Sequence, residues 1–286
     1  MQPQKRLQPI SSLRDAAQSW AAQHPRSLPS IRYPDPCDRC KGTGIAGYSW
    51  ETGDQFCTCS TGAYMQQRDQ RARDEIQAER ARQLREQSIG RLEAFSKLHC
   101  LDGHVPSFAT MRPMVALDKI RDFGAAWDGI RSILLMGRVG RGKTQLLLAL
   151  VNEVMPQLMA RQQTLRLITV PDFMKELRSG FDPERQQAKE SYATLMDTYR
   201  TCGLLVFDDL GAEKLTDWVQ EQFYLLFDYR YRQNLPIWAT SNYFFNELGE
   251  RLDERVHDRI RQSFDLLVVQ GPNQRDEAIK TRKVGA

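Results

Sequence analysis

The chain has 286 residues, 41% of them hydrophobic, and its 40 Lys and Arg residues outnumber its 36 Asp and Glu residues to give a net charge of +4. This composition excludes a collagen-like, low-complexity or wholly disordered protein. No apolar stretch of the sequence is long enough to span a bilayer, and the basic N-terminus is not followed by a hydrophobic segment. We therefore expect a cytoplasmic protein with no membrane partner.

The first 62 residues divide into an arm and a cysteine-rich segment. Residues 1–36 contain six prolines and are expected to form a loosely ordered arm. Residues 37–62 carry two cysteine pairs, Cys37 with Cys40 and Cys57 with Cys59, and have too few apolar residues to fold by hydrophobic burial alone. Four thiolates are what a closed tetrahedral zinc site requires. We predict a zinc-binding module here, with a redox pair, idle thiols or an iron–sulfur cluster as the alternatives.

Residues 63–105 are expected to form a polar helical connector, because residues from about 63 to 95 are rich in Gln, Arg, Glu and Ala and contain no proline, which predicts a long helix. Few of these residues are apolar, so the helix is interpreted as a solvated connector, a partner-facing arm or a plain linker. Cys100 and Cys202 stand apart from the other cysteines. Both are expected to be small buried hydrophobic residues rather than nucleophiles.

Residues 106–286 alternate short apolar runs with helical segments. The runs are SILLM (132–136), LRLITV (165–170), LLVFDDL (204–210), PIWATSN (236–242) and DLLVV (265–269). Alternation of this kind predicts an α/β domain in which a parallel sheet is covered by helices.

A phosphate-binding loop is predicted between the first of these runs and the helix after it. Gly137, Gly140, Gly142, Lys143 and Thr144 fit the pattern GxxxxGK[ST]. The glycines allow backbone N–H groups to surround phosphate oxygens, and the following helix adds its positive end at the same place. The lysine is expected to reach the β- and γ-phosphates and the threonine a Mg²⁺ ion.

Two further strands end in polar residues that suit a nucleotide site. Asp208 and Asp209 follow a buried run, and Asn242 follows the next one. We expect Asp208 to hold Mg²⁺ and Asp209 to polarise the attacking water. Asn242 is expected to orient that water or to contact the γ-phosphate, with a turn-forming asparagine as the alternative.

Several ordered segments resemble the DnaC/DnaI/IstB group of AAA+ ATPases, over roughly residues 114–275. They are LLVFDDLGAEK, WVQEQFYLLFDYRYRQNLPIWATSNY and LGERLDERVHDRI. The resemblance implies a lidless AAA+ P-loop domain with a five-stranded parallel sheet in the order 5-1-4-3-2, and it places Asn242 beside Asp209. It also implies an arginine supplied to the neighbouring subunit's site, Arg259 by position, with Arg255 as the second choice. Arg275 matches a basic position that touches nucleotide, and Gln145 departs from the group's usual residue but should line the phosphate site.

The resemblance and the order of modules favour an ATP-dependent loader of a replicative DNA helicase. The zinc module would bind the helicase, and the AAA+ domain would bind ATP, Mg²⁺ and single-stranded DNA and associate with further copies. The alternatives are an IstB- or TnsC-like transposition helper, which assembles on duplex DNA, and an adaptor that binds ATP without hydrolysing it. Basic residues that could contact either form of DNA are Arg138, Arg141, Arg161, Arg166, Arg178, Arg255, Arg259 and Arg261.

Overall fold

The computed structural model describes residues 37–39, 45–49, 53–100, 103–111, 116–180, 192–212 and 216–274. The predicted arm (1–36), Cys40 and Arg275 lie outside these residues. The chain divides into two compact units, Met1–Ile76 and Gln77–Ala286. In the part of the chain that is described, no helix has the length and apolar character needed to cross a bilayer.

The first unit contains a small antiparallel hairpin. Strand β1 (Ile45–Ser49) pairs with β2 (Gly53–Phe56), and the register is irregular between Ile45 and Gly47. Helix α2 (Ser60–His99) begins directly after the Cys57–Cys59 pair, so the cysteines lie where the hairpin meets the helix.

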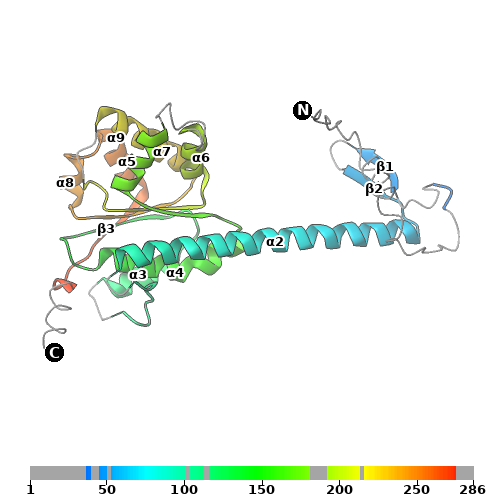
Figure 1. The fold of residues 1–286 in the computed structure, drawn as a ribbon, viewed down its shortest axis with the longest axis horizontal. Helices are drawn as coiled ribbons and strands as arrows, with labels where there is room; N and C mark the ends of the chain where they lie inside the picture. The colour runs from blue at the N-terminus through cyan, green and yellow to red at the C-terminus, as the bar shows by residue number, and fades with distance from the viewer. Residues whose placement is uncertain are drawn as a thin grey trace, which may run out of the picture. The chain divides into compact units, whose positions relative to one another are not determined.

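Helix α2 is 40 residues long and is drawn in cyan in Figure 1. Arg, Glu, Gln and Ala dominate its sequence, and ion pairs one turn apart, such as Asp69 with Arg73, support the helical conformation. Its last part belongs to the second unit, where Leu92 and Phe95 are buried. The predicted polar helix is therefore present, but its C-terminal turns contribute to a hydrophobic core.

The second unit is built around a five-stranded sheet with the order β4-β5-β6-β3-β7, in which every pairing is parallel. Its strands are β3 (Ser132–Met136), β4 (Leu165–Thr169), β5 (Leu204–Asp208), β6 (Ile237–Ser241) and β7 (Phe264–Val268). Numbered within the sheet, this is the predicted order 5-1-4-3-2, which is confirmed. The prediction that the domain has no helical lid refers to residues after Gln274, which lie outside the described residues.

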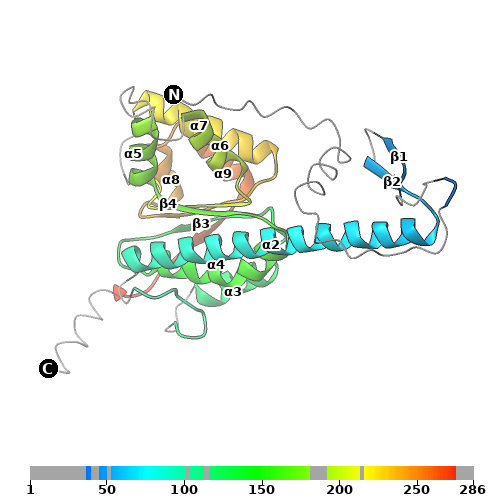
Figure 2. The same cartoon turned by 45° about the vertical axis from the view of Figure 1, so that its right-hand side comes forward.

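Helices cover both faces of this sheet (Figure 2). They are α3 (Leu117–Ala125), α4 (Lys143–Ala160), α5 (Val170–Gly180), α6 (Tyr192–Thr201), α7 (Asp217–Arg232), α8 (Phe245–Gly249) and α9 (Glu254–Ser263). α3, α4 and the end of α2 lie on one face, and α5 to α9 lie on the other.

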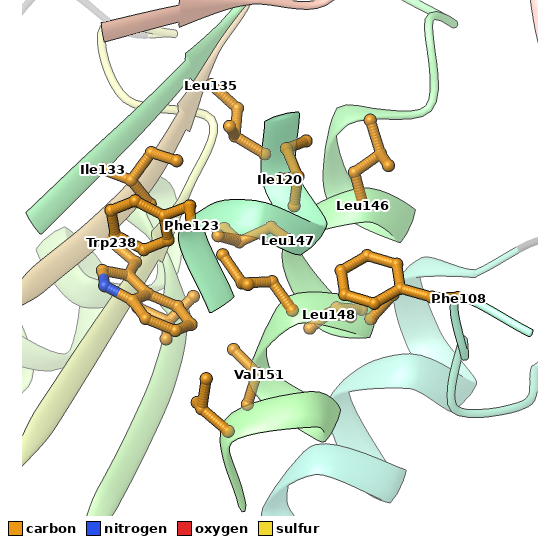
Figure 3. Close-up of a cluster of buried hydrophobic side chains, with 14 of the residues drawn as sticks. Phe108, Ile120, Phe123, Ile133, Leu135, Leu146, Leu147, Leu148, Val151 and Trp238 are labelled. Atoms are coloured by element: carbon orange, nitrogen blue, oxygen red, sulfur yellow. The ribbon is translucent and has the colours of Figure 1, made fainter. Parts of the chain in front are cut away.

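Alternate residues of the central strands enter two separate cores, because successive side chains of a strand point to opposite faces. Ile133 and Leu135 of β3 pack with the α3 and α4 side, whereas Leu134 and Met136 pack with the α5 to α9 side. Figure 3 shows the first core, in which Trp238 of β6 is fully buried and meets Phe123 edge-on, with ring centroids 5.8 Å apart. Every residue of β3, β5 and β6 is buried, so the carboxyl ends of these strands form a rigid edge.

Candidate nucleotide-binding site

The loop between β3 and α4 has three positions whose backbone conformation favours glycine. Gly137, Gly140 and Gly142 have φ values of 148°, 79° and 83°. A Cβ atom on Gly140 would lie 2.0 Å from Oδ1 of Asn273, and one on Gly137 would lie 2.5 Å from the carbonyl oxygen of Val269. The glycines of the motif therefore combine an unusual backbone with close packing against the segment after β7.

Lys143 begins α4 and is 5% exposed. Its Nζ donates to Oδ1 of Asn242 at 2.7 Å and to the carbonyl oxygen of Arg138 at 3.0 Å. Nδ2 of Asn242 in turn donates to Oδ1 of Asp209 at 2.9 Å. These three side chains, predicted from three separate segments, form one hydrogen-bonded chain. The ammonium group is surrounded by oxygen acceptors, as it would be among phosphate oxygens.

Asp208 lies at the end of β5 and is 4% exposed. Both of its carboxylate oxygens accept from Oγ1 of Thr144, at 3.0 and 3.1 Å, and Oδ1 also accepts from Oγ1 of Thr240 at 2.6 Å. Burial raises the pKa of Asp208, and the neighbouring Asp209 raises it further, while the two threonine hydroxyls oppose the shift. A buried carboxylate paired with a hydroxyl, beside a second carboxylate, is a donor set that suits Mg²⁺.

Thr240 also belongs to this site, although the sequence did not single it out. Its fully buried hydroxyl donates to Asp208 and accepts from the backbone N–H of Asp209 at 3.0 Å. Asp209 has a φ of 60°, which is uncommon for a residue other than glycine. Thr240 thus fixes both the first carboxylate and the strained backbone of the second. Threonine is common in strands because its side chain is β-branched, so its presence in this apolar run did not indicate a role in hydrogen bonding to Asp208.

A cavity of about 400 Å³ lies beside these side chains. It is lined by Leu98, His99, Cys100, Val139, Gly140, Gly142, Lys143, Thr144, Gln145, Asp208, Asp209, Asn242 and Gln274. Gln145 therefore lines the site. The end of α2 forms a second wall that the sequence did not predict, where Leu98 is 80% exposed.

Arg255 and Arg259 both lie on α9, and neither is among the described residues that line this cavity. Arg255 forms two hydrogen bonds with Asp253, at 2.9 and 3.1 Å, and its guanidinium lies 4.1 Å from the ring centre of Tyr224. Arg259 lines a second cavity of about 320 Å³, which lies where β3 and β6 begin. Arg259 thus lies at the edge of the sheet where the strands begin, whereas the P-loop follows the end of β3.

The cysteines of the first unit converge as a metal site would require. The Sγ atoms of Cys37, Cys57 and Cys59 all lie within 4.8 Å of one another. The backbone N–H of Gly62 donates to Sγ of Cys59 at 3.4 Å, and a Cβ on Gly62 would lie 1.7 Å from the carbonyl oxygen of Cys57. Three convergent sulfur atoms in a segment with little apolar surface suit zinc. The fourth predicted ligand, Cys40, lies outside the described residues.

The two isolated cysteines are buried, Cys100 at 8% exposure and Cys202 at 3%. Burial raises the pKa of the Cys202 thiol, although the nearby guanidinium of Arg230 opposes the shift. This is the inert environment expected of a small core residue.

Comparison with known proteins assigns the second unit to a family. The family described as the bacterial DnaA ATPase domain matches residues 114–266, which is more than half of the chain. The chain belongs to this family.

Curated relatives agree with the resemblance to DnaC and DnaI. The chain is 29% identical to the replicative helicase loader DnaI of Bacillus subtilis over 132 residues, which cover 46% of this chain and 39% of DnaI. It is also 29% identical to the replicative helicase loader DnaC of Escherichia coli K12 over 157 residues, which cover 54% of this chain and 61% of DnaC. The chain thus matches less than two thirds of either relative. The expected DnaC/DnaI-type AAA+ ATPase is confirmed.

Solved structures with related folds include a DnaC helicase loader and an AMPPCP-bound DnaA from Aquifex aeolicus. The first is 24% identical, with a TM-score of 0.49, and covers 57% of this chain and 96% of that one. The second is 20% identical, with a TM-score of 0.48, and covers 63% of this chain and 55% of that one.

Proposed function

We propose that this protein is an ATP-dependent loader of a replicative DNA helicase. The observation that carries the proposal is the hydrogen-bonded chain Lys143–Asn242–Asp209, which lies beside the Thr144–Asp208 pair at the carboxyl edge of the sheet. These side chains are the parts needed to hold a nucleoside triphosphate and to attack it with water. The relatives whose printed name is replicative helicase loader support the choice of partner.

Each residue of the site has a role that follows from its position. Lys143 would leave the oxygen of Asn242 to bind the β- and γ-phosphates, and Thr144 with Asp208 would hold Mg²⁺. The ion would supply positive charge to the phosphate oxygens. Asp209 would then orient and polarise the attacking water, and Asn242 would keep the Asp209 carboxylate in place. This last contact favours hydrolysis over an adaptor that only binds ATP.

Arg259 would complete the site of a neighbouring copy. Its distance from the P-loop of its own subunit supports a role in trans, and its placement beside a hollow surface allows a neighbouring subunit to reach it. Hydrolysis would then depend on self-association. Arg255, which Asp253 binds in bidentate fashion, is the second choice.

The partners follow from the two units. The cysteine module, with zinc bound by Cys37, Cys40, Cys57 and Cys59, would contact the helicase, and the AAA+ unit would contact single-stranded DNA in the cytoplasm. The solved structure of a DnaA bound to AMPPCP and single-stranded DNA supports the second contact. Nucleotide would stabilise the assembly, and hydrolysis would release it.

The test is size-exclusion chromatography with mass detection of the full chain, Mg-ATP and the replicative helicase of the same cell. Co-elution is expected with the wild type and with Asp209→Asn, which should bind ATP without turnover. Co-elution should be lost with Cys57→Ser, which should also lose its zinc by metal analysis. If no complex forms and the protein instead assembles with ATP on duplex DNA, the loader proposal fails and a transposition helper is supported.

A control on the trans role uses two arginines of the same helix. Arg259→Gln should lower the ATPase rate by about 10³-fold, the scale reported for arginine fingers. Arg261→Gln, which removes the partner of Asp258, should leave the rate measured without DNA unchanged. Equal rates for both variants would exclude Arg259 from the site.

A further inference from the structure

Arg259 is already bound within its own subunit. Its Nη2 donates to Oδ1 of Asp228 at 3.0 Å, its Nη1 donates to Oε1 of Gln262 at 3.1 Å, and its guanidinium lies 4.7 Å from the ring centre of Tyr231. Its side chain is 26% exposed. Its Nε is buried and has no hydrogen-bond partner among the described residues, so the guanidinium is held but incompletely satisfied.

Asp228 is shared between two arginines. Its Oδ1 binds Arg259, and its Oδ2 binds Nη2 of Arg232 at 2.8 Å. The carboxylate is 11% exposed, whereas the Arg232 side chain is 67% exposed. If Arg259 moved away, Arg232 would still neutralise the carboxylate. The departure of Arg259 therefore does not leave a buried charge without a partner, which is the costly part of breaking such a pair.

The cavity beside this cluster suits an anion. Arg230, Arg232 and Arg259 line it, and among its described lining residues there is no Asp or Glu. Arg230 is fixed by backbone carbonyls and cannot move into the cavity. Arg232 and Arg259 present the remaining donors, and guanidinium groups bind phosphate oxygens with the same planar geometry that they use for carboxylates.

We propose that Asp228 is a positioning residue that competes with the neighbouring subunit's nucleotide phosphates for Arg259. This inference rests on the proposed trans role of Arg259. In a free subunit Asp228 holds the arginine against α7. When a nucleotide-bound neighbour docks, the phosphates take the guanidinium and Arg232 retains Asp228. Because the phosphates must displace Asp228 from Arg259, a higher protein concentration is needed for subunits to activate one another.

The test measures the ATPase rate of the full chain against protein concentration. Asp228→Asn keeps the size of the side chain and weakens its hold on Arg259, so the half-activating concentration should fall by about two- to five-fold, the range expected for one partly exposed ion pair. Arg232→Gln removes the competing partner of Asp228, so the same concentration should rise by a similar factor. Asp265→Asn, whose partly exposed carboxylate pairs with Arg131 and not with Arg259, Asp228 or Gln262, is the matched control and should change nothing.

Competition predicts that the half-activating concentration falls in Asp228→Asn and rises in Arg232→Gln, and a purely structural role does not. A carboxylate that merely joins α7 to α9 would raise the half-activating concentration in both variants, and this outcome would overturn the proposal. An unchanged concentration in Asp228→Asn would overturn it as well. If Asp228→Asn lowers the thermal unfolding midpoint, its half-activating concentration is not interpreted. The rise expected for Arg232→Gln then tests the proposal by itself. The double variant Asp228→Asn with Arg259→Gln should match Arg259→Gln alone. A wild-type rate in Arg259→Gln would instead refute the trans role itself.

Discussion

Replacing Thr240 by valine removes one hydroxyl group at the end of β6 and leaves the shape of the side chain nearly unchanged. In the wild type that hydroxyl donates to Asp208 at 2.6 Å and accepts from the backbone N–H of Asp209 at 3.0 Å. Thr240 is fully buried; its contact with Asp208 is buried and its contact with Asp209 is part-buried. The change therefore removes a hydrogen bond to a carboxylate and leaves a backbone donor without its partner.

The magnitude follows from these two contacts. A hydrogen bond to a charged group contributes about 1.5–3 kcal/mol, and an unpaired buried N–H costs about 1–3 kcal/mol. Because the two effects share one atom and are not additive, we expect the free energy of unfolding to fall by about 2–4 kcal/mol. The positive φ of Asp209 would lose its restraint, so the ATPase rate should fall by about 10²-fold. Nucleotide affinity should change little, because the hydrogen bonds of Lys143 do not involve Thr240.

The assay is urea unfolding of the full chain together with the steady-state ATPase rate, with Thr240→Ser as the control. Serine keeps the hydroxyl and loses one methyl group, for which we expect a cost of about 1 kcal/mol and a nearly normal rate. Equal losses of stability in the two variants would refute the reasoning, because the hydroxyl would then contribute nothing.

The pH dependence gives a second reading of the same change. The Thr240 hydroxyl opposes the rise in the pKa of Asp208, so valine should raise that pKa further. A carboxyl group with a raised pKa in the folded state favours folding at low pH, and that benefit is lost as the pH rises through the raised pKa. The stability deficit of Thr240→Val should therefore grow from acidic to neutral pH. A deficit that shrinks over this interval would contradict the assigned cause.

Three further changes are predicted. Gly140→Ala should weaken nucleotide binding at least about tenfold by calorimetry, because a φ of 79° is strained for alanine and the added Cβ would meet Asn273. Its control, Gly90→Ala, has open space around the new Cβ in α2 and should raise the free energy of unfolding in urea by about 0.5–1 kcal/mol. Cys202 should stay unmodified by iodoacetamide at pH 8 and react only in denaturant, since burial raises the pKa of its thiol; peptide mapping that finds rapid labelling of the folded protein would contradict this. Arg230→Met should lower the free energy of unfolding by about 3 kcal/mol, because the guanidinium donates to the backbone carbonyls of four residues, and an unchanged urea midpoint would show that the buried charge cancels that benefit.

The sequence was sufficient to predict which residues meet at the carboxyl edge of the sheet. Asp208 and Asn242 lie at the ends of apolar runs, and Lys143 follows the glycine loop that continues another; parallel strands bring such positions to one edge. The proximity of Asn242 and Asp209 came from the family resemblance, and the hydrogen bond between Lys143 and Asn242 came from the structure. The strand order, in contrast, came from the resemblance to a family, because apolar runs of similar length do not specify which strands are neighbours.

The rest of the site depends on register and on tertiary packing. Thr240 reaches Asp208 because β5 and β6 pair with Phe207 opposite Ala239, and no local pattern specifies that register. The wall formed by Leu98 and its neighbours is the end of a helix whose composition indicates only solvent exposure. The pair between Asp228 and Arg259 joins α7 to α9, which are separated in the chain by β6 and α8. The sequence of each helix indicates only an ordinary charged segment.

The order of strands in the sheet has a consequence for how the protein is made. β3, which carries the P-loop, pairs on one side with β6 and on the other with β7, and both emerge from the ribosome about a hundred residues or more after it. Until then the buried run Ile133–Met136 and the first turns of α4 have no neighbouring strand, and long-range parallel pairing is slow. The nascent chain must keep this apolar segment from aggregating while the intervening residues are synthesised. The ability to bind phosphate therefore arises only after β6 and β7 have been synthesised.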